Sequence, residues 1–148
     1  MLFRSSVAYD PNNIFGKILR GEIPAHKVYE DDIAFAFMDI MPRAEGHVLV
    51  IPKENARDLF DVSSQTLSAL IKRVQHVARV VRKALDADGM TLHQFSESAG
   101  GQVIFHLHFH ILPRWEGVAL RPPGVMADDA KLAAQAEKIR AAMTPFTD

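Results

Sequence analysis

The sequence predicts an α+β domain in which helices pack on a five-stranded antiparallel sheet. Two observations favour this class: five β-prone segments lie along the chain, and one long segment with helical periodicity separates the third from the fourth. The 148 residues are 48% hydrophobic and 24% charged, which suits one soluble domain with a buried core. No apolar run is long enough to span a bilayer, so we expect no membrane association.

The first expected element is a short helix near the N-terminus. Residues 1–11 show no periodicity, and we interpret them as an irregular arm. Asparagines at positions 12 and 13 can cap a helix, which should stop at Gly21. Between them, apolar residues recur at helical spacing: Ile14, Phe15, Ile18 and Leu19.

Three strands are expected next, at residues 27–29, 33–38 and 47–52. An acidic turn at residues 30–32 separates the first two and indicates a hairpin. The third segment, His-Val-Leu-Val-Ile-Pro, is apolar enough to be buried on both faces and is closed by its proline.

One long helix has the clearest periodicity in the chain. It should begin at Ser63 or Ser64 and stop at Asp88–Gly89. Its apolar face is formed by Leu67, Leu70, Ile71, Val74, Val77, Ala78, Val81 and Leu85.

Two further strands and a helix complete the domain. Residues 90–95 and 103–112 are β-prone and flank a polar, glycine-containing loop at 96–102. After a Pro-Gly break at 121–124, the alanine-rich residues 128–143 favour a C-terminal helix. The weak apolar face of this helix leaves open how tightly it packs.

Composition narrows the classes of function. A formal net charge of −1 gives no basic field for a nucleic-acid backbone, so a phosphate group must be held in a local pocket, which argues for a small ligand. The chain has no cysteine, which excludes disulfides, thiolate zinc sites and cysteine nucleophiles. Its first residues contain no apolar run of signal-peptide length, so a cytoplasmic location is expected.

Three histidines alternate along the last expected strand. His106, His108 and His110 should share one face of it, because successive side chains in a strand point to opposite sides. Imidazole serves as nucleophile, acid or base near neutral pH, and one neutral ring can attack phosphorus while a protonated neighbour neutralises phosphate oxygens. Such a row suits the transfer of a charged group.

Two other interpretations of these histidines stay open. A single histidine on a strand is usually a surface or core residue without a chemical role, but three at strictly alternating positions fit that interpretation much less well. Histidines at alternate strand positions also bind zinc, and a three-histidine zinc site with an open coordination position could hydrolyse esters. Spacing alone therefore leaves both the catalytic and the metal interpretation open.

The loop that enters this strand carries further candidates. Gly100 and Gly101 permit close backbone approach, so N–H groups of the loop can face an anion. Gln102 adds an amide that can donate to an oxyanion or a leaving group, and His47 opens the third strand. Each of these features is a weak signal by itself.

Taken together, the motifs resemble those of the histidine triad family. Residues 106–112, His-Leu-His-Phe-His-Ile-Leu, fit the family signature His-φ-His-φ-His-φ-φ, in which φ is apolar, at every position. The resemblance runs from residue 12 to 115, which delimits a histidine triad (HIT) domain and leaves the arm 1–11 and a tail 116–148 outside it. Further stretches resemble the family in order and spacing: residues 13–18, 21–25, 37–40, 46–53 and 100–102.

The resemblance implies a five-stranded antiparallel sheet paired in a homodimer, and a site for a purine nucleoside monophosphate. By position, His108 matches the family nucleophile, which forms a covalent nucleotidyl-histidine. His106 and His110 match its flanking partners at the phosphate, and His47 matches a fourth histidine that supports the site. Asp39 matches the carboxylate that binds the ribose hydroxyls. The apolar walls around the base match Ile14, Phe15, Ile18, Phe37 and Ile40.

Two positions depart from the family pattern. Ser96 stands where relatives commonly carry asparagine, and Val103 stands where many carry serine or threonine, so each loses a polar group beside the expected nucleotide. We assign both to the nucleotide site together with Gly101. Because the triad itself is intact, we expect these departures to tune turnover.

The sequence therefore predicts a purine nucleotide phosphoramidase or related nucleotidyl hydrolase that releases a nucleoside monophosphate. No cofactor is expected to be required, zinc is the less favoured alternative, and neither nucleic acid nor membrane is an expected partner. Cleavage of dinucleoside polyphosphates by the same nucleophile is a second hypothesis. A third is a nucleotide-binding module with little turnover, motivated by Ser96 and Val103.

Overall fold

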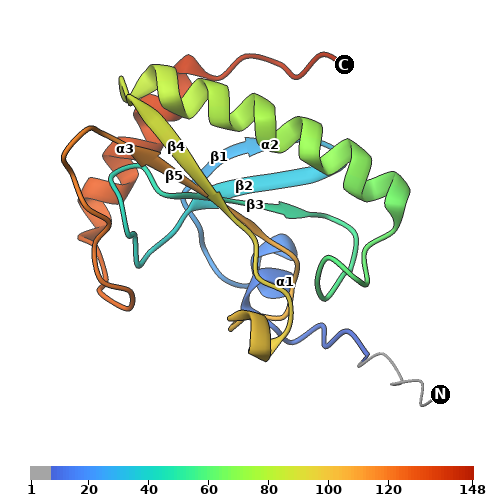
Figure 1. The fold of residues 1–148 in the computed structure, drawn as a ribbon. Coiled ribbons are helices and arrows are strands. Elements are labelled where there is room, and N and C mark those ends of the chain that lie inside the picture. Colours follow the sequence, from blue (N-terminus) through green and yellow to red (C-terminus); the bar gives the residue numbers. More distant parts are fainter. Residues whose placement is uncertain (1–7) are drawn as a thin grey trace.

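The chain folds around one five-stranded antiparallel sheet with the strand order β1-β2-β3-β5-β4, seen in a computed structural model that describes residues 8–148 (Figure 1). The predicted α+β class is confirmed. The first seven residues of the expected N-terminal arm lie outside the described part. In chain order the elements are α1 (Ile14–Leu19), β1 (Lys27–Glu30), β2 (Ala34–Met38), β3 (Val48–Pro52), α2 (Ser64–Ala84), β4 (Gly89–His93), the 3₁₀ turn η1 (Ser98–Gly100), β5 (Phe109–Arg114) and α3 (Asp129–Ala142).

Helix α1 starts and stops where the sequence predicted. The Asn13 side chain accepts a hydrogen bond from the Gly16 N–H at 2.8 Å and so satisfies a donor that the first turn leaves free. The helix ends two residues before Gly21.

The hairpin of β1 and β2 is likewise confirmed. In its acidic turn, the Asp31 carboxylate accepts hydrogen bonds of 2.8 Å from the N–H groups of Ile33 and Ala34. This local bonding of an aspartate to the backbone two and three residues ahead is what makes the residue a turn former.

Helix α2 has the predicted beginning but a different end. Ser63 caps it by accepting a hydrogen bond from the Thr66 N–H at 3.1 Å. The expected stop at Asp88–Gly89 is wrong, because Asp86 already turns the chain with a left-handed φ of 51°, which aspartate tolerates better than most residues. Gly89 instead begins β4.

The last strand is shorter and later than predicted. It covers Phe109–Arg114 and not residues 103–112. The residues before it are irregular and bond outside the sheet, as the Leu107 N–H does when it donates to the Ala56 carbonyl at 2.9 Å. Of the three alternating histidines, only His110 lies in the strand, so the expectation that all three share one strand face is wrong.

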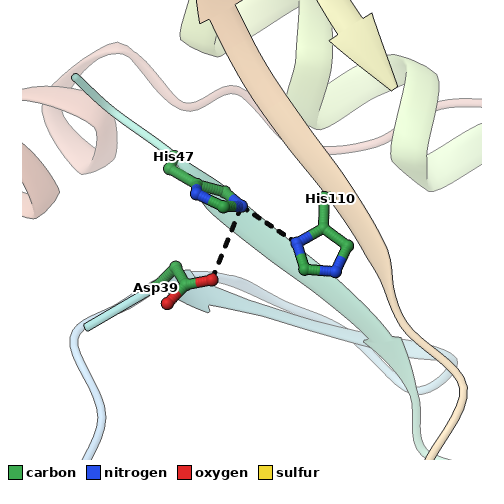
Figure 2. A group of neighbouring side chains, drawn as sticks. All are labelled: Asp39, His47 and His110. Carbon is green, nitrogen blue, oxygen red and sulfur yellow. Dashed lines mark hydrogen bonds and ion pairs between the residues drawn. The ribbon is translucent and has the colours of Figure 1, made fainter. Parts of the chain in front are cut away.

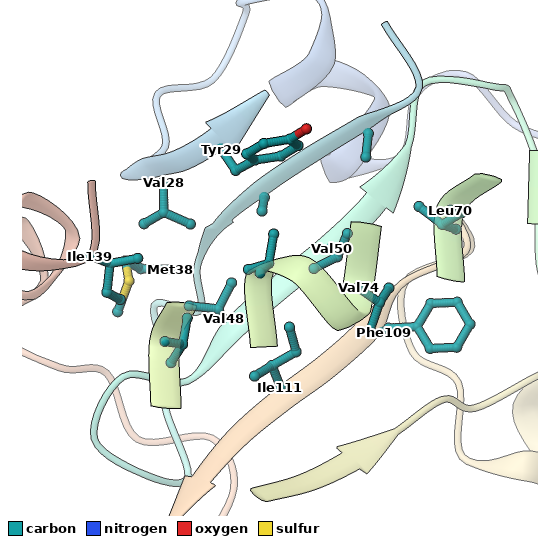
Figure 3. Packing of buried hydrophobic residues seen from close by; sticks show 14 of the residues in the cluster. Val28, Tyr29, Met38, Val48, Val50, Leu70, Val74, Phe109, Ile111 and Ile139 are labelled. Carbon is teal, nitrogen blue, oxygen red and sulfur yellow. The ribbon is translucent and has the colours of Figure 1, made fainter. Parts of the chain in front are cut away.

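The two faces of the sheet are covered differently, because side chains alternate along each strand. Val48 and Val50 lie on the face that α2 contacts, in a core whose other members include Val28, Met38, Leu70, Val74, Ile111 and Ile139 (Figure 3). Leu49 and Ile51 point to the opposite face and pack with Phe15 of α1 and Phe37. The candidate site lies on this second face.

Helix α3 is packed firmly in spite of its weak apolar face. Leu132, Ala136 and Ile139 are all buried, and the helix contacts β1, β2 and α2. Three buried residues at helical spacing are thus enough to dock it. Across residues 8–148, no helix combines the length and the apolarity that a membrane span requires.

Candidate active site

A cavity of about 460 Å³ opens on the face of the sheet that α2 does not cover. This size is typical of sites for small ligands, and most of its wall is apolar. The structure brings together there twelve of the residues that the sequence singled out: Ile14, Phe15, Ile18, Phe37, Asp39, Ile40, His47, Gly101, Gln102, Val103, His108 and His110. His106 and Ser96 are not in the wall.

The expected nucleophile, His108, is held with one defined nitrogen free. Its Nδ1 lies 2.7 Å from the backbone carbonyl oxygen of His106, which can only accept a hydrogen bond. The proton of a neutral ring is therefore on Nδ1, and the lone pair is on Nε2. Burial lowers the pKa of His108, so the ring is neutral near pH 7.

Hydrogen bonds also set the proton positions of two neighbouring histidines, His47 and His110 (Figure 2). The Arg43 N–H donates to His47 Nδ1 at 3.0 Å, so the proton of a neutral His47 is on Nε2. That nitrogen lies 3.0 Å from His110 Nδ1 and 3.5 Å from the Asp39 carboxylate. The bond leaves the proton of His110 on its other nitrogen, Nε2.

Burial keeps this pair uncharged. It lowers the pKa of His47, and it lowers the pKa of His110 to about 3, with the neighbouring His108 and His47 adding to the effect. The ring centroids of His108 and His110 are 4.9 Å apart, so a neutral ring whose Nε2 can donate a hydrogen bond lies beside the ring of His108.

Asp39, His47 and His110 also form a group that could hold a metal ion, because their ligand atoms all lie within 4.8 Å of one another (Figure 2). This is a different set from the three alternating histidines. Zinc would need the lone pair of His47 Nε2, whereas the Arg43 N–H already occupies the lone pair on Nδ1 and leaves the proton on Nε2. The observed hydrogen bonds therefore oppose a zinc centre at this group.

His106 lies behind the cavity wall and is fully buried. Its Nε2 donates to the Pro52 carbonyl at 2.9 Å, and its Nδ1 lies 2.5 Å from the Tyr9 hydroxyl. With both ring nitrogens bonded to protein groups, the ring does not reach the place expected for it at the phosphate. Its backbone carbonyl, which orients His108, is what it contributes to the site.

The remaining site residues predicted from the sequence lie in or next to the loop 96–102. The two protons of the Gln102 amide are donated to the carbonyls of Arg57 and Ile104, at 2.7 and 3.0 Å, so in this conformation the amide holds the loop in place. The Ser96 hydroxyl accepts from the Gln94 amide at 2.8 Å, outside the cavity. Gly101 and Val103 do line the cavity, and Val103 is 83% exposed.

Sequence reasoning missed several residues of this region, and four of them have an identifiable role or origin. His93 ends β4 and stands opposite His110 in the sheet register, which a pairing of the last two strands could have indicated. Arg43 acts through its backbone N–H, which no sequence pattern reveals. Tyr9 belongs to the arm interpreted as irregular, and Pro123 to the tail placed outside the domain.

The tail reaches the site through the segment that follows Asp39. The Arg121 N–H donates to the Arg43 carbonyl at 2.8 Å, and Arg43 Nε donates back to the Arg121 carbonyl at 2.9 Å. Ala127 N–H bonds to the Ile40 carbonyl at 3.0 Å. Residues outside the predicted domain thus hold the segment that contains Arg43, and the N–H of Arg43 determines which nitrogen of His47 carries the proton.

Comparisons with known proteins show which family of proteins this chain resembles in sequence and fold. The family model described as "HIT domain" matches residues 20–117. A HIT-like protein from Bartonella henselae, described as involved in cell-cycle regulation, has a crystal structure with a TM-score of 0.88 and 53% identity, over 93% of this chain and all of that one. A Zn-bound histidine triad family protein from Mycobacterium smegmatis has a TM-score of 0.78 and 32% identity, over 88% of this chain and 92% of that one. The adenylylsulfatase HINT3 of Arabidopsis thaliana is 39% identical over 103 residues, which are 70% of this chain and 52% of that protein.

Proposed function

The chain belongs to the histidine triad (HIT) family, and on this premise we propose that it is a purine nucleotide phosphoramidase or related nucleotidyl hydrolase in which His108 becomes nucleotidylated. Proteins of this family are generally nucleotide hydrolases or transferases. One observation carries the proposal. The His106 carbonyl holds the proton of His108 on Nδ1, which leaves the lone pair of Nε2 for attack on phosphorus in an apolar cavity.

The proposed reaction has two steps. His108 Nε2 attacks the α-phosphorus of a nucleoside phosphoramidate, a phosphorus–nitrogen bond forms to the ring, and the bond to the amine breaks, so that the amine leaves with that electron pair and takes up a proton. The ring then carries positive charge, which the bond from Nδ1–H to the His106 carbonyl stabilises. Water next attacks phosphorus, releases the nucleoside monophosphate and frees Nε2. His110 Nε2–H is suited to donate to a phosphate oxygen in both steps.

Two features of the cavity support a purine nucleoside as the substrate body. The Asp39 carboxylate is partly exposed in the wall and is suited to accept hydrogen bonds from a ribose diol. Flat apolar surface for a base comes from the walls that the resemblance assigned, Ile14, Phe15, Ile18, Phe37 and Ile40.

Charge in the cavity favours a single phosphate over a polyphosphate. Among the described residues that line it, Arg43 is the only lysine or arginine, and Asp39 is the only carboxylate. A dinucleoside polyphosphate would place several negative charges beside one cation. We therefore rank the dinucleoside polyphosphate hydrolase second. Parallel assays of turnover with adenosine phosphoramidate and with diadenosine tetraphosphate would show which of the two activities is greater.

Replacement of the nucleophile tests the proposal. We expect His108→Ala to lower turnover of adenosine phosphoramidate at least about a thousandfold, because no other lone pair stands at the same place. Binding of AMP, followed by calorimetry, should stay within a few fold. His76→Ala, on α2 and far from the cavity, is the matched control and should turn over normally.

Three results bear on the alternatives. Normal turnover by His108→Ala would show that the assignment is wrong. Tight AMP binding by the unaltered protein without turnover of either substrate would favour the binding-module hypothesis. Stoichiometric zinc in the purified protein, with activity lost to a chelator, would favour the metal hypothesis.

We also propose that the protein is a homodimer joined through β4. This strand is at one end of the sheet order and, among residues 8–148, β5 is the one strand that pairs with it. The strand at the other end, β1, is covered by α3, whose Arg140 donates to the Lys27 carbonyl at 2.6 Å. An uncovered edge strand is a template for pairing, and antiparallel pairing of two β4 strands would continue the sheet across both subunits.

A further inference from the structure

The stretch that precedes α1 contributes a side chain to the support of the active site. The Tyr9 hydroxyl lies 2.5 Å from His106 Nδ1 and accepts a hydrogen bond from the Asn13 amide at 2.8 Å. The Tyr9 and His106 rings meet edge to face, with centroids 5.5 Å apart. Tyr9 lies before both the predicted domain, 12–115, and the part matched by the family model, 20–117.

The direction of these hydrogen bonds follows from the partners. The Pro52 carbonyl can only accept, so the proton of a neutral His106 is on Nε2 and its Nδ1 is an acceptor. The Tyr9 hydroxyl must then be the donor. Burial raises the pKa of Tyr9, which keeps the hydroxyl protonated, and burial lowers the pKa of His106 to about 4, which keeps the ring neutral.

Tyr9 is thereby linked to the nucleophile through one residue. The His106 carbonyl receives the Nδ1–H of His108, and it lies in the irregular stretch before β5, where no strand ladder fixes the backbone. What holds His106 is the Leu107 N–H bond to Ala56 and its own ring, clamped between Pro52 and Tyr9.

The first helix leaves room for this contact. A side-chain carbon added at Gly16 would lie 3.1 Å from the Tyr9 hydroxyl and 3.0 Å from the Pro11 carbonyl, both tighter than ordinary contacts. Asn13, which caps the same helix, also orients the hydroxyl. Helix α1 is thus built so that a tyrosine from the preceding stretch can reach the buried histidine.

We propose that Tyr9 is a positioning residue of the active site: its hydroxyl fixes the ring of His106, and so the carbonyl that keeps the attacking nitrogen of His108 unprotonated. This inference rests on the proposed function for its kinetic consequence, but the effect on the two rings requires no substrate.

Tyr9→Phe tests the proposal because it removes one oxygen and keeps the aromatic ring. We expect kcat for adenosine phosphoramidate to fall about tenfold, with KM changed less than about twofold, because a misoriented nucleophile affects the reacting geometry more than the binding of the base and ribose. In ¹⁵N NMR spectra of the substrate-free protein, the His106 Nδ1 signal should lose its hydrogen-bonded shift, and His108 should change from one tautomer to a mixture.

Tyr29→Phe is the matched control, since Tyr29, on β1, is the other tyrosine of the chain. Its hydroxyl also donates to a side chain, the carboxylate of Asp31. It should leave both kcat and the His108 signals unchanged. Thermal unfolding of both variants, followed by circular dichroism, separates local from global effects.

The outcomes are distinct. If Tyr9→Phe keeps the unaltered kcat and a single His108 tautomer, the proposal is overturned. It is also overturned if kcat falls only in proportion to unfolded protein while the His108 signals of the folded fraction stay the same. If the unaltered protein shows no turnover, the proposed function fails, and the NMR comparison still decides the role of Tyr9.

Discussion

At the scale of single residues, backbone groups set the proton positions of the imidazoles. The His106 carbonyl fixes His108, the Pro52 carbonyl fixes His106, and the Arg43 N–H fixes His47. Because these partners are backbone atoms, they remain in the chain when the side chains of the same residues are replaced. The result is a set of neutral rings in which each nitrogen is assigned either to donate or to accept, as nucleophilic attack on phosphorus requires.

The buried imidazoles make stability depend on pH. The pKa of His106 is about 4 in the folded protein, against 6.5 for an exposed histidine, so between these values the unfolded chain binds more protons. Stability should therefore be full above pH 6.5 and fall as the pH is lowered toward 4, with His106 responsible for a loss of about 3 kcal/mol.

Urea unfolding at pH 7 and pH 5 measures this effect. His106→Gln, which keeps a donor for the Pro52 carbonyl but does not titrate, should lose about 2 kcal/mol less than the unaltered protein between the two pH values. Equal losses in the two proteins would contradict the assignment of His106.

At the scale of elements, the turn that delivers His47 depends on one glycine. Gly46 precedes β3 with a φ of +73°, and a side-chain carbon there would lie 2.0 Å from the Leu85 side chain at the end of α2. We expect Gly46→Ala to lower the free energy of unfolding by about 1–3 kcal/mol, through left-handed strain and displacement of Leu85.

Gly89→Ala is the control for this prediction. Its φ is not left-handed, and an added carbon would meet nothing within 4 Å. The midpoint of urea unfolding should stay close to that of the unaltered protein, and an equal drop in both variants would show that the Gly46 turn has no special role.

At the scale of the whole molecule, the proposed homodimer rests on the edge of the sheet formed by β4. Light scattering after gel filtration should give twice the 16.5 kDa mass of the chain. Leu92 on β4 is 47% exposed, and Leu92→Lys should shift the protein to monomer because a charge at an edge strand blocks pairing.

The matched control places lysine at a comparably exposed apolar position elsewhere. Ile71 on α2 is 41% exposed, and Ile71→Lys should remain dimeric. A monomeric unaltered protein, or loss of dimer in both variants, would argue against β4 as the interface.

Local chemistry explains what the sequence determined by itself. The Asn13 and Ser63 caps, the Asp31 turn and the periodicity of α2 each involve partners a few residues apart, so short patterns were enough to predict those elements and the α+β class. The family was predicted for the same reason, since its motifs are short: the alternating histidines together with the stretches at 13–18, 21–25, 37–40, 46–53 and 100–102.

Tertiary structure alone decided where β5 begins, how His106 is oriented and what holds Arg43, because the residues that bond to one another in each case are far apart in the chain. The strand around the triad is cut short by a bond from Leu107 to Ala56, His106 is turned toward Pro52 and Tyr9, and Arg121 of the tail holds Arg43. Sequence alternation records which side chains could share a face, but hydrogen bonds to segments more than forty residues away determine which of them do. The family was thus readable from the sequence, and the assignment of His108 as the nucleophile stays a prediction. The contact of the arm with His106 and the contact of the tail with the Arg43 segment became visible only in the folded chain.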